Sequence, residues 1–231
     1  MLRRFEQVLL FSGGIDSFVA YHFLKFPPTV YFDLKNRYSK KEIQVIQSLI
    51  PQTIIDNSLN LSDIEKDSGY IPYRNLFLAM MASSKYSDNV VIAGLQDDVV
   101  SDKNEEIFKQ FSEMLSILEK RSIQVVSPFW QMTKSEVVKW FLIQYPEKVN
   151  ELLSTISCYS SNSESTYCGK CSSCFRKWIA LRANGIYLDF DNLDMIQIYK
   201  KKFAEGAYDV VRCQVSLKVI TEYEKEKGYC C

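Results

Sequence analysis

The sequence predicts an α/β fold, a Rossmann-like, doubly wound sheet of five mostly parallel strands. Short apolar runs alternate along the chain with segments of helical periodicity, which is the pattern of repeated strand–helix units. The runs are apolar on both faces and rich in Val, Ile and Phe, as expected for strands buried between two layers of helices. With 231 residues, we expect one α/β unit followed by an appendage.

Five strands and five helices are expected in order along the first unit. The strands are predicted at 8–11, 29–34, 53–56, 89–95 and 123–129, and the helices at 18–25, 39–50, 71–82, 104–120 and 133–142. Ser39–Glu42 and Thr133–Glu136 have the pattern of a capping box, which predicts helix starts there. The helix at 71–82 is apolar on nearly all sides and should be buried. The helix at 104–120 has an apolar stripe that should face the core, formed by Ile107, Phe108, Phe111, Leu115 and Leu118.

A glycine-containing stretch, Ser12–Ser17, joins the first strand to the first helix. Gly13 and Gly14 can bring backbone N–H groups close to a ligand, and the helix behind them presents the positive end of its dipole. This layout favours a phosphate-binding loop. The alternative is an ordinary strand-to-helix turn in which Ser or Asp caps the helix. The stretch lacks the Gly-Lys-Ser/Thr ending of a Walker A loop.

Further polar residues fall at the carboxyl ends of predicted strands, where a doubly wound sheet binds its ligands. Asp97 and Asp98 lie at the end of the fourth strand and could contact a base, a ribose or magnesium. Arg74 in the first turn of a buried helix, and Lys134 at a helix start, could contact phosphate or carboxylate. The alternative for each of these charged residues is a solvated or salt-bridged side chain.

The composition argues against several classes of protein. The formal net charge is zero, with 28 basic and 28 acidic residues, so direct nucleic-acid binding is not expected. We find no signal-peptide pattern and no apolar span of about 18 residues, so we expect no membrane partner and a cytoplasmic location with reduced thiols. The one histidine, His22, falls in the first predicted helix and gives little basis for histidine-dependent catalysis.

Four of the seven cysteines have the spacing of a metal site, at Cys158, Cys168, Cys171 and Cys174. Such a set predicts a structural zinc ion with sulfur at all four positions, in a knuckle loop over 154–176. Gly169 allows the turn whose N–H groups point at the thiolates. The alternatives are a thiol redox pair or an iron–sulfur cluster. The remaining cysteines lack metal spacing and are interpreted as a packed thiol, Cys213, and an exposed tail, Cys230 and Cys231.

Ser12–Ser17 resembles the pyrophosphate loop of the ATP pyrophosphatases, which cleave ATP to AMP and pyrophosphate. With this loop and the cysteine cluster together, the sequence is similar to the 7-cyano-7-deazaguanine synthase family of the queuosine pathway. The matching stretches are Ser12–Ser17, Arg37–Glu42, Pro72–Asn75, Ser127–Pro128 with Thr133–Glu136, and Ser157–Cys158 with Cys168–Cys174. The resemblance extends over roughly residues 5–186 in chain order.

This resemblance implies an ATP-dependent carbon–nitrogen ligase. It would adenylate the carboxylate of 7-carboxy-7-deazaguanine and, with ammonia, convert it through the amide to the nitrile. Mg²⁺ would accompany ATP, and the resemblance leaves room for a homodimer. The residues implied in catalysis are Asp16, Ser17, Arg74 and Lys134. Those implied in nucleotide binding are Leu10, Phe11, Ser12, Gly13, Gly14, Ile15, Asp16, Ser17, Gly94, Asp97, Asp98 and Asp102.

Two stretches depart from the family's pattern. The family usually has aromatic-Gly-Gln-Arg where Leu34–Arg37 stands, and Tyr-Pro-Asp-Cys where Val100–Lys103 stands, so that only Asp102 is kept in the second. One alternative is therefore a diverged enzyme that stops at the amide or adenylates another acid. A nucleotide-binding zinc module without turnover is another. A zinc-finger DNA binder is disfavoured by the zero net charge and the single knuckle. The family ordinarily lacks residues 187–231, so the resemblance implies an α/β unit at 1–186 and an α-rich C-terminal extension at 187–231. In this extension a helix is expected at 191–205.

Overall fold

A five-stranded sheet forms the centre of the molecule in a computed structural model that describes residues 4–98, 100–158, 167–188, 193–208 and 210–228. The strand order is β3-β2-β1-β4-β5, and each neighbouring pair runs parallel. This order reverses direction between β1 and β4, which is where doubly wound sheets bind ligands. The predicted fold class is confirmed, with strands β1 (Val8–Leu10), β2 (Thr29–Phe32), β3 (Ile54–Asp56), β4 (Asn89–Val91) and β5 (Gln124–Val126).

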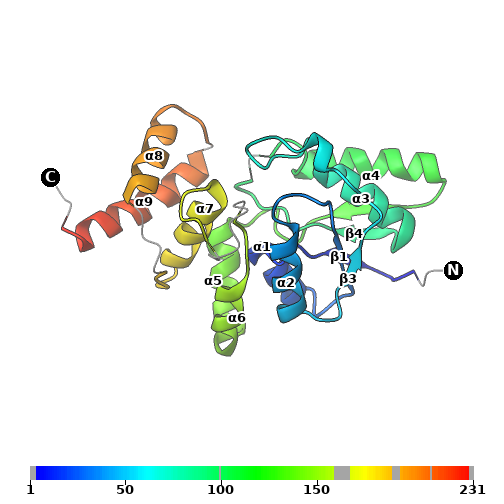
Figure 1. Cartoon of the computed structure of the whole chain (residues 1–231), viewed down its shortest axis with the longest axis horizontal. Helices are drawn as coiled ribbons and strands as arrows, with labels where there is room; N and C mark the ends of the chain where they lie inside the picture. Colours follow the sequence, from blue (N-terminus) through cyan, green and yellow to red (C-terminus); the bar gives the residue numbers. More distant parts are fainter. Residues whose placement is uncertain (1–3, 99, 159–166, 189–192, 209, 229–231) are drawn as a thin grey trace.

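Helices cover both faces of the sheet (Figure 1). Leu9, Tyr31 and Val91 point into a core shared with α1 and α5, and the residues before and after them point into a core shared with α3 and α4. This alternation explains why the strands are apolar on both faces. The helices are α1 (Ile15–Phe23), α2 (Ser39–Leu49), α3 (Arg74–Lys85), α4 (Glu105–Glu119), α5 (Lys134–Gln144), α6 (Val149–Ser154), α7 (Ser172–Arg182), α8 (Leu193–Ala204) and α9 (Val210–Glu226), with 3-10 turns η1 (Ser62–Ile64) and η2 (Pro146–Lys148).

One of the two predicted capping boxes forms. At the start of α5, Thr133 and Glu136 make the reciprocal hydrogen bonds of a capping box. At the start of α2 the prediction is wrong, because Tyr38 is the N-cap residue and makes no side-chain capping bond. The Glu42 carboxylate instead accepts a hydrogen bond from the Tyr31 hydroxyl at 2.6 Å. Glu42 is thus directed to the sheet rather than back to its own helix.

Helices α3 and α4 are less buried than the sequence predicts. In α3, Met80 is 42% exposed, because only one side of the helix meets the sheet. In α4, Phe108 and Leu115 are buried as predicted, but Leu118 is 68% exposed. Strands of three residues span about 10 Å, whereas the 15 residues of α4 span about 22 Å. The C-terminal turn of α4 therefore extends beyond the sheet.

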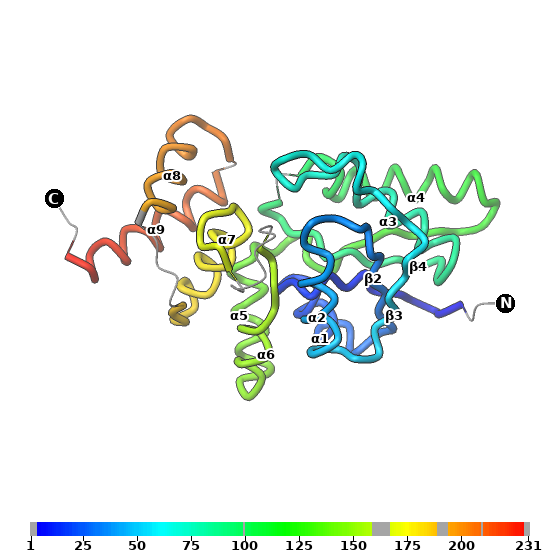
Figure 2. The backbone as a smooth tube through the Cα atoms, viewed as in Figure 1, coloured from blue at the N-terminus to red at the C-terminus, as the bar shows by residue number. Residues whose placement is uncertain are grey.

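The C-terminal helices α8 and α9 pack on α7, at the end of the molecule opposite the N-terminus (Figure 2). An aromatic cluster joins them, with the rings of Phe175 and Tyr199 stacked 3.9 Å apart. The helix expected at 191–205 is confirmed as α8 over its described part. Among the described helices, none combines the length and the apolarity needed to cross a membrane.

Candidate active site and metal centre

The loop between β1 and α1 has the geometry of an anion-binding turn. Gly13 adopts φ +70°, a left-handed conformation that favours glycine. Helix α1 starts after Gly14, which provides no side-chain cap, so the alternative of a helix capped by Ser or Asp is wrong. The Ser17 hydroxyl donates to the Gly14 carbonyl at 3.0 Å and lies 3.3 Å from the Ser12 hydroxyl. Both hydroxyls therefore lie at the positive end of the α1 dipole.

The segment leading to the cysteine cluster packs against this loop. The Ile156 N–H donates to the Gly13 carbonyl at 2.8 Å. A Cβ atom on Gly14 would lie 3.3 Å from both the Ile156 carbonyl and the Ser157 hydroxyl. Because this approach is close, Gly14 is needed for packing as well as for access to a ligand.

A cavity of about 200 Å³ lies at the carboxyl ends of the strands, next to this loop. The predicted residues that line it are Leu10, Phe11, Ser12, Gly14, Asp16, Ser17, Arg74, Asp98 and Lys134. The predicted residues outside its lining are Gly13, Ile15, Gly94, Asp97 and Asp102. Four stretches distant in sequence thus meet at one cavity, as the sheet topology requires.

Two residues outside the lining are explained by packing. A Cβ atom on Gly94 would lie 2.1 Å from the Trp130 ring, so this position is glycine because the indole covers it. Asp102 is buried, and its carboxylate accepts hydrogen bonds from the Asn75 main-chain N–H at 3.0 Å and side-chain amide at 2.9 Å. These bonds fix the first turn of α3, which carries Arg74 into the cavity.

Alternating charges line the phosphate-loop end of the cavity. Lys134 Nζ lies 2.5 Å from Asp16 Oδ1. Burial lowers the pKa of Lys134, although Asp16 opposes this shift. Asp98 pairs with Lys103 and with Arg176, each at 2.6 Å, and these cations hold its pKa well below the usual range in spite of burial. Asp98 is therefore ionised at neutral pH and held between two cations.

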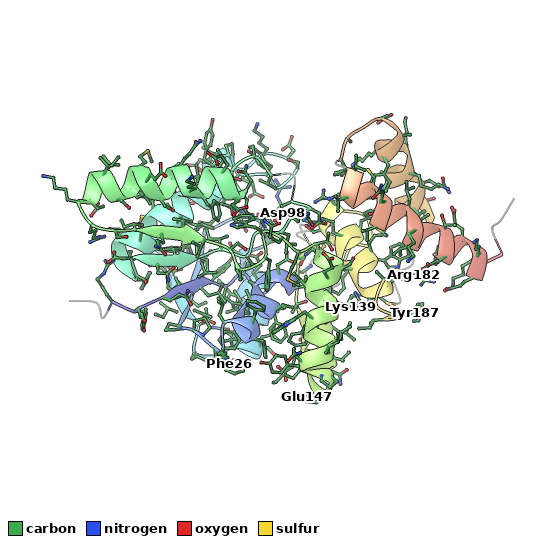
Figure 3. The ribbon with its side chains drawn as sticks, turned by 180° about the vertical axis from the view of Figure 1, so that it is seen from behind. Phe26, Asp98, Lys139, Glu147, Arg182 and Tyr187 are labelled. Atoms are coloured by element: carbon green, nitrogen blue, oxygen red, sulfur yellow. The ribbon has the colours of Figure 1, made fainter. Side chains whose placement is uncertain are left out.

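Three charged residues of the cavity lining were not predicted as site residues from the sequence: Glu42, Lys103 and Arg176. Glu42 has the spacing of a capping residue, so the sequence predicted a role at the helix start rather than at the cavity. Arg176 follows the cysteine cluster by two residues and reaches the site only because α7 packs beside α5. Figure 3 shows Asp98, the partner of Arg176, in the middle of the molecule, where the sheet meets the C-terminal helices.

The four clustered cysteines are positioned to bind a metal ion. Their sulfur atoms all lie within 4.8 Å of one another, and Cys168 Sγ is 3.9 Å from Cys174 Sγ. Tetrahedral coordination with metal–sulfur bonds of about 2.3 Å separates sulfurs by about 3.8 Å. The Cys171 N–H points at Cys168 Sγ at 3.4 Å, and Gly169 between them adopts φ +67°. The turn predicted for a knuckle is therefore present. Part of the predicted loop, 159–166, and the tail cysteines Cys230 and Cys231 lie outside the described residues.

Comparison with protein families assigns the chain. A model described as queuosine biosynthesis protein QueC matches residues 29–185, more than half of the sequence. The chain belongs to this family. It is accordingly an enzyme of an ATP-dependent ligase family. The matched range begins after the loop Ser12–Ser17, so the loop is an independent observation.

Curated relatives of this QueC family member carry one name. A 7-cyano-7-deazaguanine synthase of Psychromonas ingrahamii is 25% identical over an alignment of 217 residues, covering 78% of this chain and 94% of the relative. Another, of Methanococcus aeolicus, is 28% identical over 226 residues, covering 78% of this chain and 96% of the relative. The similarity thus extends over nearly the whole length of each relative.

The two stretches that depart from the family's pattern line the same cavity. Leu34 and Asn36 come from the first stretch, and Val100 and Lys103 come from the second. The Lys103 ammonium group is committed to protein partners, since it pairs with Asp98 and donates to the Ala93 carbonyl at 3.1 Å. Both stretches that depart from the family's pattern therefore contribute residues to the site.

Proposed function

We propose that the protein adenylates the carboxylate of 7-carboxy-7-deazaguanine and, with ammonia, converts it through the amide to 7-cyano-7-deazaguanine. One observation carries this proposal: the loop Ser12–Ser17 shares a cavity with Arg74, Asp98 and Lys134 at the carboxyl ends of parallel strands. The names of the curated relatives support the same overall reaction.

The reaction needs activation of a poor electrophile rather than a side-chain nucleophile. A carboxylate oxygen attacks the α-phosphorus of ATP, and the bond to pyrophosphate breaks. Ammonia then attacks the carboxyl carbon, loses a proton and displaces AMP, which leaves the amide. A second ATP adenylates the amide oxygen, and loss of AMP and the two amide protons leaves the nitrile.

The residues at the loop suit the charge that develops on pyrophosphate. The α1 N-terminus and the hydroxyls of Ser12 and Ser17 would hold its oxygens. Lys134 and Arg74 would stabilise negative charge on phosphate or carboxylate. Mg²⁺ bound with ATP would supply further charge stabilisation, and Asp16 offers a carboxylate for it.

We propose that the ion held by the four cysteines is zinc and that its role is structural. Sulfur at all four positions leaves no place for an activated water. Within a catalytic unit of residues 1–186, the knuckle would hold the segment that supports the phosphate loop through Ile156 and Gly13.

The test is incubation of the pure protein with MgATP, ammonia and 7-carboxy-7-deazaguanine, followed by product analysis. The expected result is nitrile, with pyrophosphate released. An Asp16→Ala variant should release no pyrophosphate, whereas a control substitution of exposed Asp63 by Ala should leave the rate unchanged. No turnover of this acid by the unaltered protein would contradict the proposal.

A second candidate is favoured by the altered cavity lining. Leu34, Asn36, Val100 and Lys103 replace the family's usual residues on the walls of the cavity. An enzyme that adenylates a different acid, or stops at the amide, would keep the phosphate loop and change these walls. Recovery of amide alone, or pyrophosphate release with another acid only, would select this candidate.

A further inference from the structure

The C-terminal helix α9 reaches the candidate active site through one side chain. Arg212 is 7% exposed, and its guanidinium donates to the main-chain carbonyl of Asp97. Its Nε lies 4.0 Å from the Asp97 carboxylate. Residue 212 lies beyond the range that matches the QueC family model, so this contact belongs to the part of the chain outside the family pattern.

Asp97 connects this arginine to two residues that line the cavity. Its carboxylate accepts a hydrogen bond from the Lys134 main-chain N–H at 3.1 Å, at the start of α5. It also lies 3.2 Å from Arg176 Nη2, and Arg176 in turn pairs with Asp98. Asp97 therefore sets both the beginning of the helix that carries Lys134 and the position of Arg176.

The charges of this network explain what Arg212 adds. Arg212, Arg176, Lys103 and Lys134 provide four cations beside the three carboxylates of Asp16, Asp97 and Asp98. The excess charge of this network is positive and lies next to the phosphate loop. Without Arg212, Asp97 would be neutralised by Arg176 alone, and less of the Arg176 charge would act on the cavity. A buried guanidinium is costly to desolvate, so its position beside Asp97 requires this compensation.

We propose that Arg212 is a positioning residue of the nucleotide site and that it acts through Asp97 on Arg176 and Lys134. The C-terminal extension would then be an integral part of the site for the polyphosphate of ATP. This inference rests on the proposed function only in taking ATP as the ligand of the cavity.

A second buried arginine provides a matched control. Arg182 of α7 also ties α9 to the rest of the protein, through an ion pair with Glu226 and contact with the Tyr223 ring. It lies beside Tyr187, on the side of α7 away from Asp98 (Figure 3). Loss of either arginine loosens α9, but only loss of Arg212 alters Asp97.

The experiment measures affinity for α,β-methylene-ATP with Mg²⁺ by calorimetry, together with the unfolding midpoint of each full-length variant. Arg212→Met should weaken binding at least about tenfold, and Arg182→Met should leave it within about twofold at a similar loss of stability. Arg212→Lys keeps a cation beside Asp97 and should recover most of the affinity. This milder variant also serves if Arg212→Met does not fold.

Equal affinities in the Arg212 and Arg182 variants would overturn the inference and leave the proposed function standing. An unaltered protein that binds the analogue but releases no pyrophosphate with any acid would remove the proposed function and leave the inference testable by the same affinities. An unaltered protein that binds no analogue would overturn both.

Discussion

Replacing Glu42 by Gln should change how the stability of the protein depends on pH. Glu42 lines the cavity, and its carboxyl group accepts a hydrogen bond from the Tyr31 hydroxyl at 2.6 Å. Burial raises its pKa from the usual 4.5 to about 7, against the opposing effects of the Tyr31 hydrogen bond and of Arg74. A Gln side chain keeps the shape and the acceptor oxygen but does not ionise.

The direction of the pH dependence follows from the protonation of Glu42 in the folded and in the unfolded chain. Below pH 4.5 the carboxyl group is protonated in both the folded and the unfolded chain, so it costs nothing. Between pH 4.5 and 7 the unfolded chain releases the proton while the folded protein keeps it, so stability falls as pH rises. Above pH 7 the full cost persists. A shift from 4.5 to 7 corresponds to about 3 kcal/mol, and roughly 2 kcal/mol remains after allowance for the half-buried position of the Glu42 side chain.

The assay is urea denaturation of the unaltered protein and of Glu42→Gln at pH 5 and pH 8. The unaltered protein should lose roughly 1.5 kcal/mol more than the variant across this range, because about a quarter of the cost is already present at pH 5. His22, whose pKa is lowered by burial, contributes equally to both proteins and cancels in the difference. The control is Gln at Glu113, an exposed position on α4. Parallel pH profiles for Glu42→Gln and the unaltered protein would refute the assignment.

Three further substitutions test the metal centre and two backbone constraints. Cys171→Ser should lose the bound metal, as measured by elemental analysis, whereas Cys213→Ser should retain it. The loss should also remove part of the roughly 10–16 kcal/mol that a structural zinc contributes. Gly94→Ala should destabilise the protein by about 1–3 kcal/mol, because the added Cβ atom would collide with the Trp130 ring. Trp130→Leu in the same chain should reduce that penalty, and additive effects of the two substitutions would contradict the predicted collision. Lys120→Gly should raise the unfolding free energy by about 1 kcal/mol, since Lys120 ends α4 with φ +53°, and no gain would show that the strain is absent.

The sheet and the turn from β1 to α1 could be predicted because their signals are local. A strand buried on both faces is a short apolar run, and the turn from β1 to α1 needs its glycines where the chain changes direction. The cysteine spacing is likewise a local signal, and it predicts the cluster of four sulfur atoms directly.

Helix α7 was missed because its buried face carries basic residues. Lys177 is fully buried, and its ammonium group donates to the Leu153 carbonyl at 3.0 Å and to the Thr155 hydroxyl at 2.9 Å. Arg176, one residue earlier, is held by Asp98 from the end of β4. Partners so distant in sequence make a charged residue indistinguishable from a solvated one when only the sequence is read. Glu42 was missed as a cavity residue for the same reason.

A metal ion held by the four cysteines would act on the loop Ser12–Ser17 through one short segment. Cys158 is two residues from Ile156, whose N–H holds the Gly13 carbonyl at 2.8 Å, and the intervening Ser157 lines the cavity. On the other side of this segment, Lys177 fixes Thr155. Because this segment is tied at both ends, a metal ion bound by the cysteines would order it and, with it, the Gly13 carbonyl beside the left-handed turn of the loop Ser12–Ser17. A closed four-sulfur site is thus suited to a positional role, because the geometry it fixes lies within a few residues of the loop.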